Sequence, residues 1–217
     1  MNNKIKVVFL ILVFAGGWIL GSQNNKAPVI TSSIGGASYA GGYQGQQGAV
    51  APRTEQGQVH IVEAGQSIQA AVEAAQPGDS IQVMPGTYSE TVYIDKDNIH
   101  LRGVIQEGKR ATLDGLGTLN DAILYSGNNV VIENFRITQY KGNGIMGQAG
   151  NNFEIRNNVI VDTGIYGIFP QLGTNGLVEH NVGSGIEDAA IYIGMSDNIH
   201  VAYNEVFDSV AGIEIEN

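Results

Sequence analysis

Isoleucine recurs in the second half of this chain at a nearly constant spacing. Ile123, Ile145, Ile168, Ile191 and Ile213 are separated by 22, 23, 23 and 22 residues, and a glycine or an alanine precedes each of them. Two further columns repeat every 23 residues: Ile132, Ile155, Val178 and Val201, and Phe135, Asn158, Asn181 and Asn204. A fixed period of this length is typical of a solenoid, in which each repeat forms one coil stacked on the next.

Apolar and polar residues alternate within each period, as in the segments 130–133 and 153–156. These segments are too short for helices, and the alternation predicts strands with one buried face. Since each coil repeats its apolar residues in the same columns, the strands should pair in parallel at a spacing of about 4.8 Å. The sequence therefore predicts an all-β fold, a right-handed parallel β-helix with about three short strands per coil.

The alternation also assigns columns to the inside and the outside of the predicted β-helix. One inward column contains Val130, Phe153, Gly176 and Ile199, and the Ile132 column is a second one. Glu133, Arg156 and Glu179 should then point outward and form an exposed ladder of opposite charges. Such surface pairs support the register more than they support stability.

Asn158, Asn181 and Asn204 fall where one strand is expected to bend into the next. Stacked amides can donate hydrogen bonds to carbonyl groups of the neighbouring coil, which a tight bend would otherwise leave unpaired. We therefore predict a structural role for these asparagines.

The region before the repeats divides into segments of different composition. Residues 1–22 begin with Lys4 and Lys6, continue with an apolar run and are predicted to be an export signal or a membrane anchor. Residues 23–57 are rich in Gly, Gln and Ser and are predicted to be a flexible linker. The domain should occupy residues 58–217. An exported protein is expected to be periplasmic, secreted or on the cell surface, and the absence of cysteine excludes disulfides.

A short amphipathic helix is predicted at the start of the domain. Ser67 is a suitable N-cap residue, residues 68–75 place apolar side chains at helical spacing, and Pro77 and Gly78 end the helix. We expect this helix to cover the open end of the first coil, where strand edges would otherwise be exposed.

The opening of the domain resembles a known family. The segments Ser67–Ala71, Pro77–Tyr88 and Ile99–Gly103 resemble the start of the pectin-lyase-like superfamily, in particular its NosD-like branch of exported proteins with parallel β-helix repeats. This resemblance implies the fold, but the superfamily includes lyases, epimerases, adhesins and copper-maturation accessory proteins. The Asp-Pro-His-Asp element of alginate epimerases is missing, because the chain contains no Asp-Pro pair.

Charge narrows the possible partners. The net charge is −10, and only one of the 21 acidic residues but four of the 11 basic residues lie before residue 58. Such an acidic domain does not attract nucleic acid or anionic lipid. An anionic polyuronate would also be repelled unless Ca²⁺ bridged the two, so Ca²⁺ is a possible cofactor. The four histidines are far apart in the sequence, which predicts isolated surface residues rather than a copper site.

The outward positions of the Gly-Ile strand predict a polysaccharide-binding track. One column contains Met146, Phe169 and Tyr192, and the next contains Gln148 and Gln171. Aromatic faces stack on sugar rings, and amides bind hydroxyl groups. The resemblance also implies binding along one outer strand face. The alternative is that the rings stack on each other and only stabilise the sheet.

The loops before these strands contain the candidate catalytic residues. Glu187 and Asp188 are adjacent carboxylates, which suit acid and base chemistry or a Ca²⁺ site. Lys141 is the best placed base for a lyase, and it follows Tyr140. Eight extra residues between Leu101 and Ile132 predict an inserted loop near the binding groove.

Together these features predict an exported β-helix protein that interacts with an extracellular or cell-wall polysaccharide, with a lyase-type or epimerase-type reaction as an extension of that function. The alternative is a non-catalytic structural or adhesive scaffold, or a NosD-like envelope accessory protein. Ile213 and Ile215 should face inward in the last coil, which nothing in this sequence covers. We therefore expect more chain, or a partner, at that end.

Overall fold

The computed structural model describes residues 57–216, which contain one helix and 19 strands. The helix is α1 (Ile68–Ala74). The strands are β1 (Val59–Val62), β2 (Ser80–Val83), β3 (Gly86–Tyr88), β4 (Val92–Ile94), β5 (His100–Gly103), β6 (Ala111–Asp114), β7 (Ile123–Tyr125), β8 (Val131–Glu133), β9 (Arg136–Thr138), β10 (Ile145–Gln148), β11 (Glu154–Arg156), β12 (Val159–Val161), β13 (Ile168–Gln171), β14 (Leu177–Glu179), β15 (Val182–Ser184), β16 (Ala189–Gly194), β17 (His200–Ala202), β18 (Glu205–Phe207) and β19 (Ala211–Glu216). The predicted signal or anchor at residues 1–22 and nearly all of the predicted linker lie outside the described residues. Within residues 57–216, no helix is long and apolar enough to cross a membrane.

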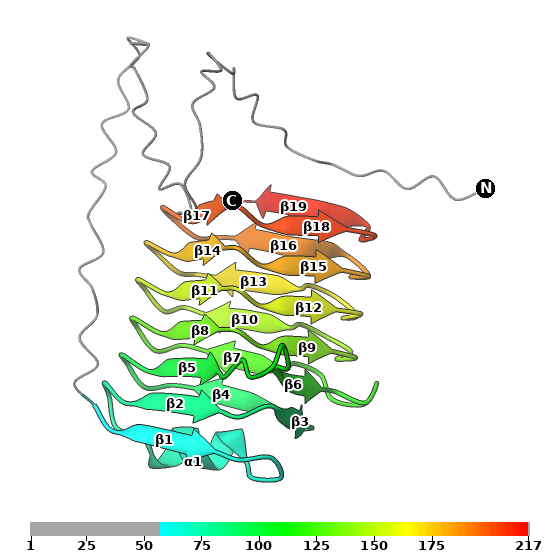
Figure 1. Ribbon diagram of the computed structural model, residues 1–217. Helices are drawn as coiled ribbons and strands as arrows, with labels where there is room; N and C mark the ends of the chain where they lie inside the picture. Colours follow the sequence, from blue (N-terminus) through cyan, green and yellow to red (C-terminus); the bar gives the residue numbers. More distant parts are fainter. Residues whose placement is uncertain (1–56, 217) are drawn as a thin grey trace, which may run out of the picture. The chain divides into compact units, whose positions relative to one another are not determined.

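The strands form three parallel sheets that wind together into the predicted right-handed β-helix (Figure 1). Sheet A has seven strands, in the order β1-β2-β5-β8-β11-β14-β17. Sheet B has the order β3-β6-β9-β12-β15-β18, and sheet C has the order β4-β7-β10-β13-β16-β19. Each complete coil contributes one strand to each sheet. The predicted isoleucine column is confirmed, because Ile123, Ile145 and Ile168 are direct neighbours in sheet C.

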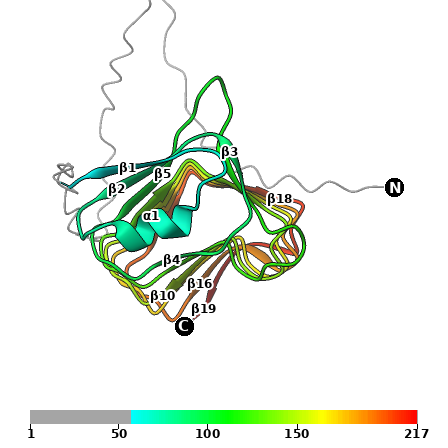
Figure 2. The same cartoon turned by 90° about the horizontal axis from the view of Figure 1, so that it is seen from below.

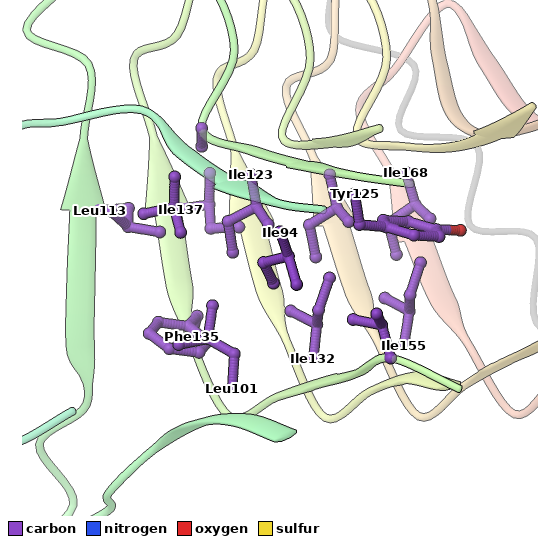
Figure 3. Packing of buried hydrophobic residues seen from close by; sticks show 14 of the residues in the cluster. Ile94, Leu101, Leu113, Ile123, Tyr125, Ile132, Phe135, Ile137, Ile155 and Ile168 are labelled. Carbon is purple, nitrogen blue, oxygen red and sulfur yellow. The ribbon is translucent and has the colours of Figure 1, made fainter. Parts of the chain in front are cut away.

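Side chains from the three sheets meet inside the coils and form the core. Ile132 and Ile155 of sheet A lie opposite Ile123 and Ile168 of sheet C, and all four are almost completely buried (Figure 3). Val130 and Phe153 are also buried, as predicted.

Gly176 is the next residue after Phe153 in this inward column. The Phe153 ring occupies the space that a side chain at position 176 would need. A Cβ atom on Gly176 would lie 2.0 Å from the Cζ atom of Phe153, so no larger residue fits there while the ring keeps its place. The large Phe153 ring and the small Gly176 thus fill the space between two neighbouring coils, which keeps these coils in contact.

The asparagine ladder has the predicted structural role. The amide of Asn181 donates to the carbonyl of Ile155 at 2.9 Å, and its side-chain oxygen accepts from the backbone N–H of Asn158 at 3.0 Å. Asn158 makes the same two kinds of bond, to the carbonyl of Ile132 and from the N–H of Phe135. Because Asn158 and Asn181 are buried, these bonds satisfy backbone groups that water cannot reach.

Helix α1 covers the open end of the first coil, as predicted (Figure 2). The Ser67 hydroxyl caps its start by accepting from Ala70. Two further side chains hold the helix ends. The Glu90 carboxylate accepts from the N–H groups of Ile68 and Gln69, and the Lys96 ammonium donates to three carbonyls of the last turn, at 2.7–2.9 Å. Both charges have the sign that stabilises the helix dipole.

The inserted residues between β5 and β7 lie at two corners of the coil. Their first part forms a tight turn between Gln106 and Lys109, located where sheet A bends into sheet B. Arg110 reaches from this turn to the carbonyl of Asn157 at 2.9 Å. This part lies beside a different corner from the predicted sugar track, because the track is on sheet C. The second part lies between β6 and β7, where sheet B passes into sheet C, and its Leu119 carbonyl accepts from the N–H of Lys141 at 2.9 Å. A role of this second part near the track stays a prediction.

The last coil keeps the repeat register. Ile213 and Ile215 pair with Ile191 and Ile193 of β16, but the two residues are 47% and 68% exposed, because no further described strand lies over them. Our expectation about what covers this end stays a prediction.

We predict that Asn181→Ala lowers the free energy of unfolding by about 2–5 kcal/mol, because it leaves buried backbone groups of Asn158 and Ile155 unpaired. Asn151→Ala is the matched control, since the Asn151 amide bonds to Asn128 at an exposed corner and water can replace it. Denaturant unfolding followed by circular dichroism measures both. Equal effects of the two substitutions would contradict the role of the buried ladder.

Two buried tyrosines allow a second test, which concerns the hydrogen bonds of polar groups in the core. The hydroxyl of Tyr125 has no hydrogen-bond partner among the described residues, whereas that of Tyr140 donates to the carbonyl of Glu90 at 2.7 Å. We expect Tyr125→Phe to leave stability unchanged or to raise it, and Tyr140→Phe to lower it by about 1 kcal/mol. The opposite order of thermal midpoints would show that the Tyr125 hydroxyl has a partner in solution.

Candidate functional site

The outer face of sheet C carries a column of mostly apolar side chains. Met146 and Phe169 are direct neighbours across β10 and β13, as predicted. The column also extends to residues that the sequence analysis did not include. It contains Tyr93, Leu124, Met146, Phe169, Tyr192 and Glu214. Tyr93 was missed because the insertion between β4 and β7 breaks the regular period, whereas Leu124 follows Ile123 and the period itself could have placed it in this column.

Three rings of this face pack together, and we call Tyr166, Phe169 and Tyr192 the aromatic platform. The ring centroids of Phe169 and Tyr192 are 5.0 Å apart in an edge-to-face arrangement. Tyr166 comes from the loop before β13 and stacks on Tyr192 at 4.6 Å with an angle of 11° between the rings. Tyr166, Phe169 and Tyr192 are all half-buried, so part of each residue is in contact with solvent.

The loop that carries Tyr166 is held by a chain of polar contacts. The Asn143 side chain accepts a hydrogen bond from the Tyr166 N–H at 3.2 Å and donates to the Asp121 carboxylate at 2.7 Å. Asn143 is buried, so these contacts are shielded from competing water. Tyr166 was not predicted as a platform residue, because its contact with Tyr192 depends on the fold of this loop and not on the period.

Gly194 and Glu216 set the position of the Tyr192 ring. A Cβ atom on Gly194 would lie 2.6 Å from the Cε1 atom of Tyr192 and 3.1 Å from the Cε2 atom of Phe169, so the rings lie over this glycine. The Tyr192 hydroxyl donates to the Glu216 carboxylate at 2.5 Å. This hydrogen bond raises the pKa of Tyr192 to about 12. The ring is therefore a neutral hydrogen-bonded group at neutral pH.

The predicted amide column lies beside the platform. Gln148 and Gln171 are direct neighbours across β10 and β13, with Gln148 exposed and Gln171 half-buried. Neither amide side chain bonds to another of the described residues, so both can bind the hydroxyl groups of a ligand. The five predicted substrate-binding residues thus share one face.

The predicted catalytic residues Lys141, Glu187 and Asp188 lie on loops next to this face. Lys141 and Glu187 occupy the same column, with Gly164 between them, so their backbones are about 9–10 Å apart. No hydrogen bond or ion pair joins these three side chains to each other in the described region. Tyr140, next to Lys141, is buried in the core and is not available to a ligand. A catalytic role for the three residues stays a prediction.

We next consider metal binding. In residues 57–216, no group of three or more His, Asp or Glu side chains is arranged to hold a metal ion. The description of all histidines as isolated was wrong. His60 bonds to Asp79 at 2.8 Å, His100 bonds to Glu133 at 3.0 Å, and His180 stacks on Tyr203.

The main charge cluster lies on a different face, the outer side of sheet A. Glu133 is 7% exposed and contacts His100, Arg102 at 3.4 Å and Arg156 at 2.8 Å. The predicted pair of Arg156 with Glu133 is present, but Glu133 is buried rather than exposed, and the second partner of Arg156 is Glu154 rather than Glu179. Burial alone would raise the pKa of Glu133, but the hydrogen bonds from His100 and Arg156 outweigh it and lower the pKa to about 2. This cluster is satisfied internally, so we assign it a structural role.

A family model described as "Right handed beta helix region" matches residues 89–217. No curated protein matches the chain. Among solved structures, the chain is similar to the A-module of the Azotobacter vinelandii mannuronan C-5 epimerase AlgE4, with 14% identity, a TM-score of 0.46, and coverage of 74% of this chain and 57% of that chain. The A-module of the epimerase AlgE6 from the same organism gives 15% identity, a TM-score of 0.44, and coverage of 74% and 52%. The chain thus spans little more than half of either module.

The Glu133 cluster predicts a dependence of stability on pH. Because the pKa of Glu133 is lowered from 4.5 to about 2, its stabilisation is present above pH 4.5 and is lost as the pH falls toward 2. We expect Glu133→Gln to destabilise the protein at neutral pH, on the order of 3 kcal/mol, and the difference from the parent should shrink between pH 4.5 and 2. Thermal unfolding over this range measures it, and a constant difference would contradict the assignment.

Proposed function

The chain belongs to the right-handed β-helix family, and we propose that it binds a polysaccharide along the outer face of sheet C. The observation that carries this proposal is the aromatic platform. Two partly exposed rings lie side by side on a parallel sheet, a third ring from the loop before β13 packs against both, and two glutamine amides lie in the adjacent column. Rings and amides together match the apolar faces and the hydroxyl groups of a sugar chain.

The direction of the track follows from the stacking of the coils. Outward side chains of the same column recur about every 4.8 Å along the solenoid. The column from Tyr93 to Tyr192 crosses five coils, and so offers an extended rather than a pocket-like surface. A polymer that lies across several coils makes many weak contacts of this kind, whereas a single sugar unit makes few. We therefore infer that the ligand is a polymer.

A structural scaffold is the second candidate function, and one observation favours it. Tyr166 and Tyr192 stack on each other, and Phe169 contacts both, so the rings also stabilise the sheet. Such contacts contribute about 0.5–1.5 kcal/mol per pair beyond the buried area. The two candidates differ in whether removing the rings abolishes binding or only lowers stability.

Catalysis is a further step within this proposal. Lys141 as a base, with Glu187 and Asp188 as acid or base, would act on a chain that lies on the platform, because these residues occupy the loops at the edge of sheet C. The proposal therefore concerns binding first. The platform rings contact each other, whereas in the described part of the chain no hydrogen bond or ion pair joins the side chains of the three loop residues. An extracytoplasmic location and a NosD-like accessory role remain predictions as well.

We predict that replacing both Phe169 and Tyr192 by Ala weakens binding to a polysaccharide about tenfold or more, because each ring contributes on the order of 1 kcal/mol. Affinity electrophoresis against a panel of neutral, cationic and anionic polysaccharides measures retention. Phe207→Ala is the control, since Phe207 is a partly exposed phenylalanine on the outer face of sheet B. If the double variant binds as the parent does but unfolds at a lower temperature, the scaffold function is supported instead.

A further inference from the structure

The strands that carry the platform have charges of one sign only, and the lysine that the sequence analysis singled out, Lys141, lies on a loop at the edge of sheet C. None of the six strands of sheet C contains a lysine or an arginine, although sheet A contains Arg102 and Arg156 and sheet B contains Arg136. The charged residues of the sheet C strands are Glu214 and Glu216, both in β19. A glycan on this face therefore meets aromatic rings, amides and carboxylates, with no cation from the strands themselves.

These carboxylates are adjacent to the rings rather than elsewhere on the sheet. Glu214 is the direct neighbour of Tyr192 in the outward column, and Glu216 accepts a hydrogen bond from the Tyr192 hydroxyl. Asp188 lies on the loop before β16. Burial first, and then the negative charges of Asp188, Glu214 and Glu216, raise the pKa of Tyr166, which places all three carboxylates within electrostatic reach of the platform.

We propose that the aromatic platform selects a polysaccharide that carries free amino groups, with Glu214 and Glu216 as the specificity-determining residues. This inference rests on the proposed function, because it names the substrate class of the same face. An ammonium group is attracted both by a carboxylate and by the face of an aromatic ring. A uronate would bring a second negative charge against Glu214 and Glu216, which costs binding energy and so gives discrimination.

A neutral glycan would not make use of the negative charge of Glu214 and Glu216, whereas an ammonium group would. Glu216 already accepts one hydrogen bond, from Tyr192, but a carboxylate has capacity for several more. Glu214 is exposed, and no other described residue bonds to its side chain. Both groups therefore retain the acceptor capacity and the charge that a cationic sugar needs.

The test compares two oligosaccharides that differ in charge but share one backbone. The full chain is titrated with a glucosamine hexamer and with the same hexamer fully N-acetylated, which removes the ammonium groups. We expect the glucosamine hexamer to bind at least about tenfold more tightly at low salt, and the preference to decrease as salt screens the charges. An oligouronate, with and without Ca²⁺, is titrated in parallel and should bind most weakly in both conditions.

Two variants locate the effect. Glu214→Gln combined with Glu216→Gln removes both charges, while the new amide oxygen at position 216 can still accept from Tyr192. We expect this double variant to lose the preference for the glucosamine hexamer over the N-acetylated hexamer. Glu205→Gln is the matched control, because Glu205 is an exposed glutamate of the same coil on sheet B, and it should keep the preference.

The results separate this inference from the function on which it rests. Equal affinity of the parent for both hexamers, or tighter binding of the oligouronate, overturns the inference but leaves polysaccharide binding in place. A preference for the glucosamine hexamer that survives in the double variant overturns the assignment of Glu214 and Glu216. If the protein binds none of the tested glycans, the inference and the proposed function are both overturned.

Discussion

The register between neighbouring coils is the constraint on which the other features of this structure depend. Asn158 and Asn181 each bond to backbone groups of adjacent coils inside the protein, so a shift of one residue would leave several buried groups unpaired. The Phe153 ring under Gly176 has the same effect through shape, because the pair fits in only one alignment. Hydrogen bonds and packing thus specify one register together.

The candidate site is a consequence of this register. Phe169 and Tyr192 are 23 residues apart in the sequence, and they meet only because the coils that carry them are stacked in phase. The same stacking divides the charges among the faces. Sheet A surrounds Glu133 with His100, Arg102 and Arg156, whereas sheet C presents carboxylates with no basic residue in its strands. A single repeat therefore builds one face whose charges pair with each other and one face whose aromatic and amide side chains stay partly exposed.

Some features of the site depend on contacts outside the repeat. The Tyr166 loop is held by Asn143 and Asp121, and the Tyr192 ring is placed by Gly194 and Glu216. Helix α1 is likewise held at both ends by Glu90 and Lys96, which lie outside the helix in the sequence. These side chains are far in the sequence from the groups that they contact. The repeat brings those groups close together, and the contacts then set their orientation.

The sequence by itself determined the coil, its inward columns, the asparagine ladder and the Ser67 cap, because each of these follows from local periodicity or local helix signals. It also placed Met146, Phe169, Tyr192, Gln148 and Gln171 on one face, since alternation along a strand is a local property. Only the tertiary structure decided that Tyr166 joins the platform, that Glu133 is buried rather than exposed, and that Lys96 binds the helix. The physical reason is that these outcomes depend on the reach of long side chains and loops across coils, which the period does not encode.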